Sequence, residues 1–173
     1  MRTPIEYGGM MSDLFSKFGT LIVDYECANE AKLRDISKEV FNNISHLEMF
    51  YPNFADWYFN KVVNGLVNGS RSFIIEFRDG KFSGVAILKD TENEKKICTL
   101  SINDEFKSKG LGYKLFEKSM RLLNTDKPLA SVSGDRLPEF EKIFDKLGYQ
   151  YSAEYSGLYL PNKSEFSFNG LLQ

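Results

Sequence analysis

Apolar and polar positions alternate with different periods along the chain, and each change of period marks a new element. Residues 20–25 form a short β-branched and aromatic run, which predicts a first strand. Asn29 is a favourable N-cap, and the apolar residues after it recur at spacings of three and four, as on one face of a helix. These apolar residues are Leu33, Ile36, Val40 and Ile44.

A second helix is expected from Pro52-Asn53 to Asn68-Gly69, because proline favours the first turn of a helix and glycine favours its end. Its apolar positions recur at helical spacing and are largely aromatic. They are Phe54, Trp57, Tyr58, Val62 and Leu66.

The rest of the chain predicts a run of strands and then alternating helices and strands. Asp79-Gly80 is a strong hairpin signal, and Gly148 stands where a helix should end. The expected strands are 72–78, 82–89, 94–102, 128–133, 149–160 and 164–169, and the expected helices are 110–123 and 137–147. The resulting order, β-α-α-β-β-β-α-β-α-β-β, is that of a mixed α/β sheet.

The length of 173 residues suits one domain, and no repeat or linker divides the chain. Hydrophobic residues make up 42% and charged residues 27%, which is ordinary for a soluble globular protein. We therefore expect a peripheral N-terminal segment over residues 1–19 and a single domain over residues 20–173.

Charge and cysteine content narrow the class of partner. Lysine and arginine total 22 against 24 acidic residues, a net charge of -2, which makes a nucleic-acid partner unlikely on electrostatic grounds. One histidine and two distant cysteines, Cys27 and Cys98, give no metal-ligand spacing and no disulfide framework. With no long apolar run, we expect a cytoplasmic protein with neither a metal nor a membrane partner. The sequence leaves open whether the protein forms a homodimer.

One segment carries the pattern of an anion site. A strand ending at Ile102 leads into Lys107-Ser108-Lys109-Gly110-Leu111-Gly112, which opens a helix. Glycines let a ligand approach the backbone, and the free amides of a first helical turn bind phosphate or pyrophosphate. An ordinary helix start is the alternative. The spacing fits neither a Walker loop nor a Rossmann fingerprint.

This segment resembles the acyl-CoA signature of the GNAT superfamily of N-acetyltransferases, with lysine in the first place of the motif. A second segment, Phe144-Asp145-Lys146-Leu147-Gly148-Tyr149, is similar to the end of the second core helix in that family. The resemblance covers residues 20–170. It implies an α/β fold with a mixed, mostly antiparallel central sheet, flanked by about four helices and splayed in the middle for acyl-CoA.

The resemblance also implies acetyl-CoA as co-substrate and locates its site. Unpaired backbone groups of a splayed strand would hold the pantetheine arm, and the motif amides would bind the pyrophosphate. The strand residues are Leu100, Ser101 and Ile102. The motif residues are Lys107, Ser108, Lys109, Gly110, Leu111, Gly112 and Tyr113.

The chain departs from the family at the usual catalytic places. Phe144 stands where many members have a tyrosine acid, and Lys96 where many have a glutamate base. Water held by Glu94, Ser131 or Ser133 could instead take the proton of the amine. Four tyrosines could act as the general acid instead, namely Tyr149, Tyr151, Tyr155 and Tyr159. Of these, Tyr159 is the catalytic candidate.

Three further features bear on the acceptor. Glu165, in the last predicted strand, would face it. The aromatic cluster of residues 50–59 could line it, although such residues are more often core. Cys98 lies among apolar neighbours and is expected to be an inert buried thiol.

The function expected from the sequence is transfer of an acetyl group from acetyl-CoA to a primary amine of a small molecule, peptide or protein. Attack would occur directly in a ternary complex, since no activated nucleophile is visible. One alternative is a catalytically weak acyl-CoA sensor or partner-binding module. Another is a toxin-like acetyltransferase acting on aminoacyl-tRNA, which the lack of basic excess disfavours.

Overall fold

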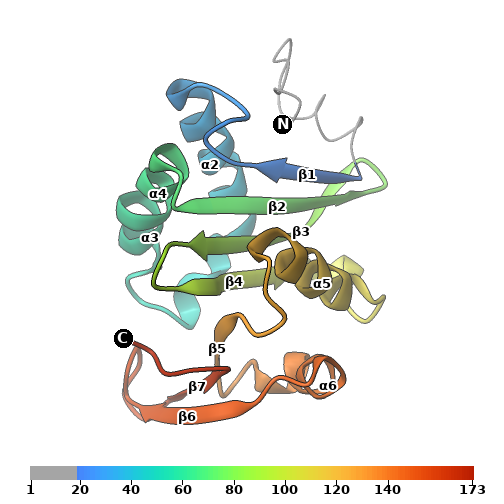
Figure 1. Ribbon diagram of the computed structural model, residues 1–173. Helices are drawn as coiled ribbons and strands as arrows, with labels where there is room; N and C mark the ends of the chain where they lie inside the picture. Colours follow the sequence, from blue (N-terminus) through green and yellow to red (C-terminus); the bar gives the residue numbers. More distant parts are fainter. Residues whose placement is uncertain (1–18) are drawn as a thin grey trace.

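One seven-stranded sheet organises residues 19–173, the part of the chain that the computed structural model describes (Figure 1). The strand order is β1-β2-β3-β4-β5-β7-β6, and every neighbouring pair is antiparallel except β4 and β5. The strands are β1 (Thr20–Val23), β2 (Arg71–Arg78), β3 (Lys81–Asp90), β4 (Lys95–Ile102), β5 (Leu129–Ser133), β6 (Tyr151–Ser156) and β7 (Ser164–Phe168).

The helices form a layer on each face of the sheet. One layer holds α2 (Glu30–Ile44), α3 (Phe54–Trp57) and α4 (Val63–Asn68), and the other holds α5 (Leu111–Leu123) and α6 (Leu137–Leu147) (Figure 1). Three short turns complete the elements: the 3-10 turns η1 (Ser45–Met49) and η3 (Asp104–Phe106), and the π turn η2 (Tyr58–Val62). The predicted element order and fold class are confirmed. The expected second helix is interrupted by η2, and β6 is shorter than expected.

Local sequence signals fix where the helices begin and end. The side-chain oxygen of Asn29 accepts a hydrogen bond from the Lys32 amide at 2.9 Å, which satisfies one free donor of α2. Gly148 ends α6 with a φ of 71°, a left-handed conformation that glycine adopts without a side-chain penalty.

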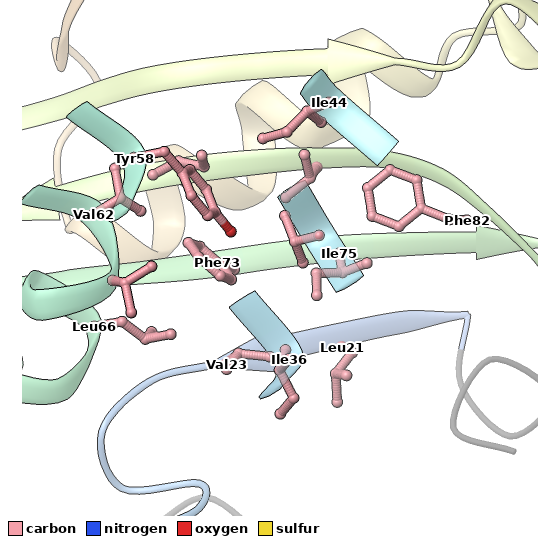
Figure 2. Close-up of a cluster of buried hydrophobic side chains, with 14 of the residues drawn as sticks. Leu21, Val23, Ile36, Ile44, Tyr58, Val62, Leu66, Phe73, Ile75 and Phe82 are labelled. Atoms are coloured by element: carbon pink, nitrogen blue, oxygen red, sulfur yellow. The ribbon is translucent and has the colours of Figure 1, made fainter. Parts of the chain in front are cut away.

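Two apolar cores lie on opposite faces of the sheet. Figure 2 shows the first, in which side chains of α2, η2 and α4 pack onto β1, β2 and β3. Tyr58 is fully buried there, and its hydroxyl donates to the Ser37 carbonyl at 2.6 Å. The second core lies between the sheet and helices α5 and α6, and its largest group is an aromatic cluster of Phe116, Phe140, Phe144 and Tyr149.

An extra residue in β4 separates the sheet into two halves. In the β3–β4 ladder Ile87 pairs with Thr99 and Leu88 with Ile97, so Cys98 has no counterpart in β3. Such a bulge bends a strand and increases its twist. Strand β4 then pairs with β5 at only two positions, Lys96 and Ile97, while it stays paired with β3 as far as Ile102. The splay expected from the resemblance is therefore present.

The N-terminal segment and the membrane are the subjects of two further expectations. The peripheral segment predicted over residues 1–19 lies, apart from Gly19, outside the described residues, and the division into domains stays a prediction. Within residues 19–173, no helix is long and apolar enough to cross a bilayer.

A buried ion pair, together with a hydrogen bond, joins strands β1 and β2 to helix α5. It yields a stability prediction. The carboxylate of Glu76 in β2 is buried, with Lys118 Nζ of α5 at 2.6 Å and the Thr20 hydroxyl of β1 donating at 2.9 Å. Lys118→Met should leave that carboxylate without its cation. We expect a loss of about 3 kcal/mol in the free energy of unfolding, measured by urea denaturation.

Two controls separate the stranded charge from the loss of a lysine. The double variant Glu76→Leu with Lys118→Met should recover most of the loss, because no buried charge remains. Lys81→Met, which breaks the exposed pair with Glu105, should cost less than about 1 kcal/mol. A Lys118→Met protein as stable as Lys81→Met would contradict the prediction.

Candidate active site

A cavity of about 260 Å³ lies beside the point where β4 and β5 separate. We call it the aromatic pocket, because rings from the turn before α3, from α3 itself and from the β6–β7 loop form most of its wall. Strands β4, β5 and β7 form its floor. Its lining residues are Tyr51, Pro52, Asn53, Phe54, Trp57, Lys96, Cys98, Thr99, Ser131, Leu158, Tyr159 and Glu165.

A second, narrower cavity of about 30 Å³ runs between β4 and β5, and we call it the splay cleft. Residues of both separating strands line it, together with Arg136 and the rings of Phe116, Phe140 and Phe144. Tyr51, Cys98, Thr99 and Ser131 line both cavities. The two cavities therefore adjoin at the bulge in β4.

Glu165 places a buried carboxylate on the floor of the aromatic pocket. Its side chain is 3% exposed, and the Tyr51 hydroxyl donates to Oε1 at 3.3 Å. Burial raises the pKa of Glu165 to about 7, although hydrogen bonds from Ser131 and Tyr51 and the charges of Lys96 and Arg136 oppose the rise. This carboxyl group therefore exchanges its proton close to neutral pH.

Strand pairing explains why Glu165 faces the pocket. In the β5–β7 ladder Ser133 pairs with Glu165 and Ser131 with Ser167, and side chains alternate between faces with a period of two. These four polar side chains thus share one face, while the apolar residues between them pack toward α6. The hydroxyls of Ser133 and Ser167 are buried, and neither has a hydrogen-bond partner among the described residues.

Two tyrosines stand over this polar row. The rings of Tyr51 and Tyr159 meet edge to face, with centroids 5.0 Å apart. Burial raises the pKa of both hydroxyls above the ordinary tyrosine value, so each stays a proton donor at neutral pH. Tyr51 lines both cavities, which places it between the pocket and the splay cleft.

The predicted anion loop leads from β4 into α5. Ser108 and Gly110 both adopt left-handed backbone conformations, with φ of 61° and 80°. The amides of Ser108, Lys109 and Gly110 have no hydrogen-bond acceptor within residues 19–173. Curled backbone with free amides is a concave site for an anion. Gly112 serves packing instead, because a Cβ there would lie 3.1 Å from Ile143.

Charged side chains connect this loop to the splay cleft. Lys107 Nζ lies 2.9 Å from Asp104 and 3.2 Å from Glu139. Burial lowers the pKa of Lys107, but the hydrogen bonds and charges of these two carboxylates outweigh it and leave the pKa raised. Glu139 also pairs with Arg136, whose Nη2 donates to the Leu100 carbonyl at 2.9 Å. Arg136 therefore bridges the cleft from β5 to β4.

Comparison with known proteins identifies this arrangement. The sequence profile of the acetyltransferase (GNAT) domain matches residues 32–156. The chain belongs to the GNAT family. The sequence matches none of the curated proteins.

Solved structures share the family fold at low sequence identity. A GNAT acetyltransferase from Bacillus cereus ATCC 10987 is 14% identical, with a TM-score of 0.57 over 86% of this chain and 94% of its own. A GNAT-family protein from Desulfovibrio desulfuricans is 18% identical, with a TM-score of 0.53 over 66% and 78% of the two chains. A streptothricin acetyltransferase from Bacillus anthracis, solved with acetyl coenzyme A, is 12% identical, with a TM-score of 0.53 over 62% and 65%. At these identities the likeness shows the fold.

The catalytic candidates named from the sequence fall in different places. Ser131 and Tyr159 line the aromatic pocket. Ser133 lies behind them in the same polar row, and Glu94 pairs with Lys89 at 2.9 Å outside the pocket lining. Phe144 lines the splay cleft.

The other tyrosines lie away from both cavities, in the described part of the chain. Tyr149 packs against Phe144 in the second core, Tyr151 is exposed on β6, and the Tyr155 hydroxyl accepts from the Leu172 amide. Of the backbone groups expected to hold pantetheine, those of Leu100 border the cleft. Ser101 and Ile102 continue along the same edge of β4 beyond its pairing with β5.

Sequence reasoning missed two residues that the fold brings to the site. The sequence marks Tyr51 only as a member of the aromatic cluster of residues 50–59, and no motif near it points to a role for its hydroxyl. Arg136 follows β5 with no motif of its own, although an arginine just before an aromatic helix face is a signal worth weighing.

Residues 19–173 contain no group of three His, Cys, Asp or Glu side chains that could hold a metal ion.

The raised pKa of Glu165 predicts a pH-dependent stability. Unfolded, this carboxyl group loses its proton near pH 4.5, whereas in the folded protein it holds the proton to about pH 7. Unfolding between these values releases a proton, so stability falls as pH rises through that range. Glu165→Gln removes this dependence. Relative to wild type, its free energy of unfolding should rise by up to about 3 kcal/mol between pH 4.5 and 7.5.

The measurement is urea unfolding of both proteins across this pH range. Glu92→Gln, in the exposed β3–β4 turn, is the matched control and should follow the wild-type curve. The slope of the difference is the readout, since it is independent of any constant packing change at position 165. A difference between Glu165→Gln and wild type that stays flat with pH would show that Glu165 is not perturbed.

Proposed function

We propose that the protein transfers an acetyl group from acetyl-CoA to a primary amine bound in the aromatic pocket. The observation that carries this proposal is the junction of the two cavities at the bulge in β4, with the Glu165 carboxylate and the Tyr51 hydroxyl beside it. Membership of the GNAT family supports acetyl transfer. The structural relative from B. anthracis binds acetyl coenzyme A, and one from Bacillus subtilis, 13% identical with a TM-score of 0.50 over 65% of this chain and 84% of its own, was solved with CoA.

The chain offers groups that suit each part of acetyl-CoA. The free amides of Ser108, Lys109 and Gly110, with Leu111 to Tyr113 in the first turn of α5, suit the pyrophosphate. The edge of β4 from Leu100 to Ile102 suits the amides of the pantetheine arm, as an added strand would. Along this path the thioester would reach the bulge at Cys98 and Thr99, where the aromatic pocket begins.

Glu165 and Tyr51 supply the proton chemistry that direct transfer requires. The Glu165 carboxylate accepts a proton from the ammonium group, and the amine then forms a bond to the thioester carbonyl carbon. The carbon–sulfur bond breaks, the nitrogen releases its remaining extra proton to solvent, and Tyr51 donates a proton to the departing thiolate. The hydrogen bond from Tyr51 to Glu165 lets the tyrosine recover that proton from the glutamic acid. A base with a pKa near 7 is well matched to neutral pH.

The phenylalanine at position 144 is compatible with this assignment. Phe144 is buried against Phe116, Phe140 and Phe168, so its ring closes the cleft. A phenylalanine ring has no acidic proton to donate to the thiolate. A thiolate leaves tolerably without assistance, since thiols have a pKa of about 8.5. Tyr51 is the donor that the structure offers beside the cleft in place of position 144.

A second candidate function is acyl-CoA binding without turnover. The observation that favours it is the buried Phe144 ring in the splay cleft, which offers no proton to a departing thiolate. Steady-state release of CoA thiol with a panel of amines separates the two functions. Tight CoA binding by calorimetry, with no thiol release above the hydrolysis rate, would favour the binding module.

The anion loop gives a prediction with an internal control. Gly110→Ala and Gly110→Asp both force a side chain into a left-handed conformation, and neither Cβ would meet another atom. Only the aspartate adds a negative charge beside the pyrophosphate. We expect Gly110→Asp to weaken CoA binding at least tenfold more than Gly110→Ala, measured by calorimetry. Equal affinities in two folded variants would rule out pyrophosphate binding at this loop.

The assignment of Glu165 gives a kinetic prediction. Glu165→Gln should lower kcat/KM for the amine by about 10²- to 10⁴-fold, the usual worth of general base catalysis. In the wild type kcat/KM should rise with pH to a plateau above about pH 7, and the variant should lose that inflection. Ser133→Ala, on the same face of β5, is the control. An unchanged inflection near pH 7 in Glu165→Gln would assign the base elsewhere.

A further inference from the structure

Two cations without a salt-bridge partner in the described part of the chain, Lys96 and Arg71, lie at the aromatic pocket, and they bear on the acceptor. Among the described residues that line the pocket, Glu165 is the one carboxylate and Lys96 is the one cation. Lys96 is half-buried, and no carboxylate within residues 19–173 lies at ion-pair distance from its Nζ. The charge of Lys96 acts on Glu165, but no salt bridge in the described part of the chain holds its ammonium group, which is therefore available to a negative group of a ligand.

A second unpaired cation reinforces Lys96. Arg71 stacks on the Trp57 ring at 5.6 Å, and its Nη1 donates to Cys98 Sγ at 2.9 Å behind the pocket floor. Like Lys96, Arg71 has no carboxylate at ion-pair distance in the described part of the chain. Burial raises the pKa of the Cys98 thiol, and the charge of Glu94 adds to the rise, while both cations lower it, so the fields of Lys96 and Arg71 reach the pocket. Arg136 adds a third positive charge near Glu165.

This field disfavours polycations and favours an amine that carries its own anion. Once Glu165 has taken the proton of the amine it is neutral, and Lys96 is then the one charged side chain among the described residues that line the pocket. A polyamine or aminosugar would bring further positive charge against Lys96, and like charges repel strongly in a low-dielectric site. A carboxylate on the acceptor would instead pair with Lys96 and offset the cost of burying it.

The size and the walls of the pocket restrict the rest of the acceptor. Its volume of about 260 Å³ lies below the 300–1,000 Å³ that is typical for drug-sized ligands. Phe54, Trp57, Leu158 and Tyr159 surround it with apolar surface. Such a cavity suits one small molecule with an apolar body better than an extended peptide.

We propose that the acceptor is a free α-amino acid with an apolar or aromatic side chain. Its amine meets Glu165, its carboxylate pairs with Lys96, and its side chain packs between Trp57 and Tyr159. This inference rests on the proposed function and names the substrate class of the same site. The product is the corresponding N-acetyl amino acid, with one amide bond formed and one thioester bond broken.

The test compares matched acceptors with and without the carboxylate. CoA thiol release is measured at saturating acetyl-CoA with phenylalanine, phenethylamine and phenylalaninamide, then with tryptophan and tryptamine, and with spermidine. We expect kcat/KM for phenylalanine to exceed that for phenethylamine and phenylalaninamide at least tenfold. Spermidine should be the poorest acceptor. An amide or decarboxylated amine that is used as well as the amino acid would overturn the inference.

Lys96→Met provides the matched variant. It should lower kcat/KM for phenylalanine at least tenfold more than kcat/KM for phenethylamine, so that the preference disappears. The ratio is the readout, because both acceptors share any effect of the lost charge on Glu165. Lys95→Met is the control, because Lys95 is an exposed neighbour that pairs with Asp90. It should keep the wild-type preference. A preference that survives Lys96→Met would overturn the role of Lys96.

Binding separates failure of this inference from failure of acetyl transfer. Calorimetric titration of phenylalanine into the protein saturated with CoA should show binding that Lys96→Met abolishes. If phenylalanine binds in this way but no amine releases thiol, the ligand class stands and the transfer reaction fails. If only amines without a carboxylate turn over, acetyl transfer stands and the amino-acid class fails. Neither binding nor turnover with any amine would overturn both.

Discussion

Strand β4 cannot pair with both neighbours along its whole length, because Cys98 adds a residue that β3 does not match. The bulge keeps β4 on β3 and turns it away from β5 after Ile97. Three features follow from this one misfit. The β4 edge is left free, a cleft opens between the strands, and the anion loop stands at the far end of that cleft. The site depends on a break in the sheet that the two apolar cores hold open.

The break is tolerated because one apolar core spans both halves of the sheet. Strands β1, β2 and β3 pack on the core of α2, η2 and α4, while the core of α5 and α6 joins Leu100 of β4 to Val132 of β5 and Phe168 of β7. The rings of Phe140 and Phe144 fill the space beside the cleft, so separation of the strands leaves little void. On the opposite face, Glu165 and the hydroxyls of Ser133 and Ser167 are buried, and neither hydroxyl has a hydrogen-bond partner among the described residues, which costs stability.

The sequence predicts those features that short-range signals determine. Asn29 and Gly148 mark helix ends through contacts within a few residues, and Gly110 marks the loop through its own backbone freedom. The site is different, because tertiary packing assembles it. Tyr51 and Glu165 are 114 residues apart, and no local pattern relates them. The bulge leaves one trace in the sequence: Ile97 and Leu100 lie in the same core although they are three positions apart, which breaks the alternation of a strand.

Arg136 supplies a hydrogen-bond donor to a backbone carbonyl at the free edge of β4. A buried carbonyl without a partner is costly, and the free edge of β4 would leave the Leu100 carbonyl in that state. The Arg136 guanidinium supplies the missing donor from across the cleft and rests on the rings of Phe50 and Phe140. A pantetheine amide donating to Leu100 would replace that bond with an equivalent one. The displaced guanidinium would keep Glu139 and both rings, so the exchange would be close to balanced. In the proposed complex, the affinity for acyl-CoA would then come from the anion loop and the thioester end.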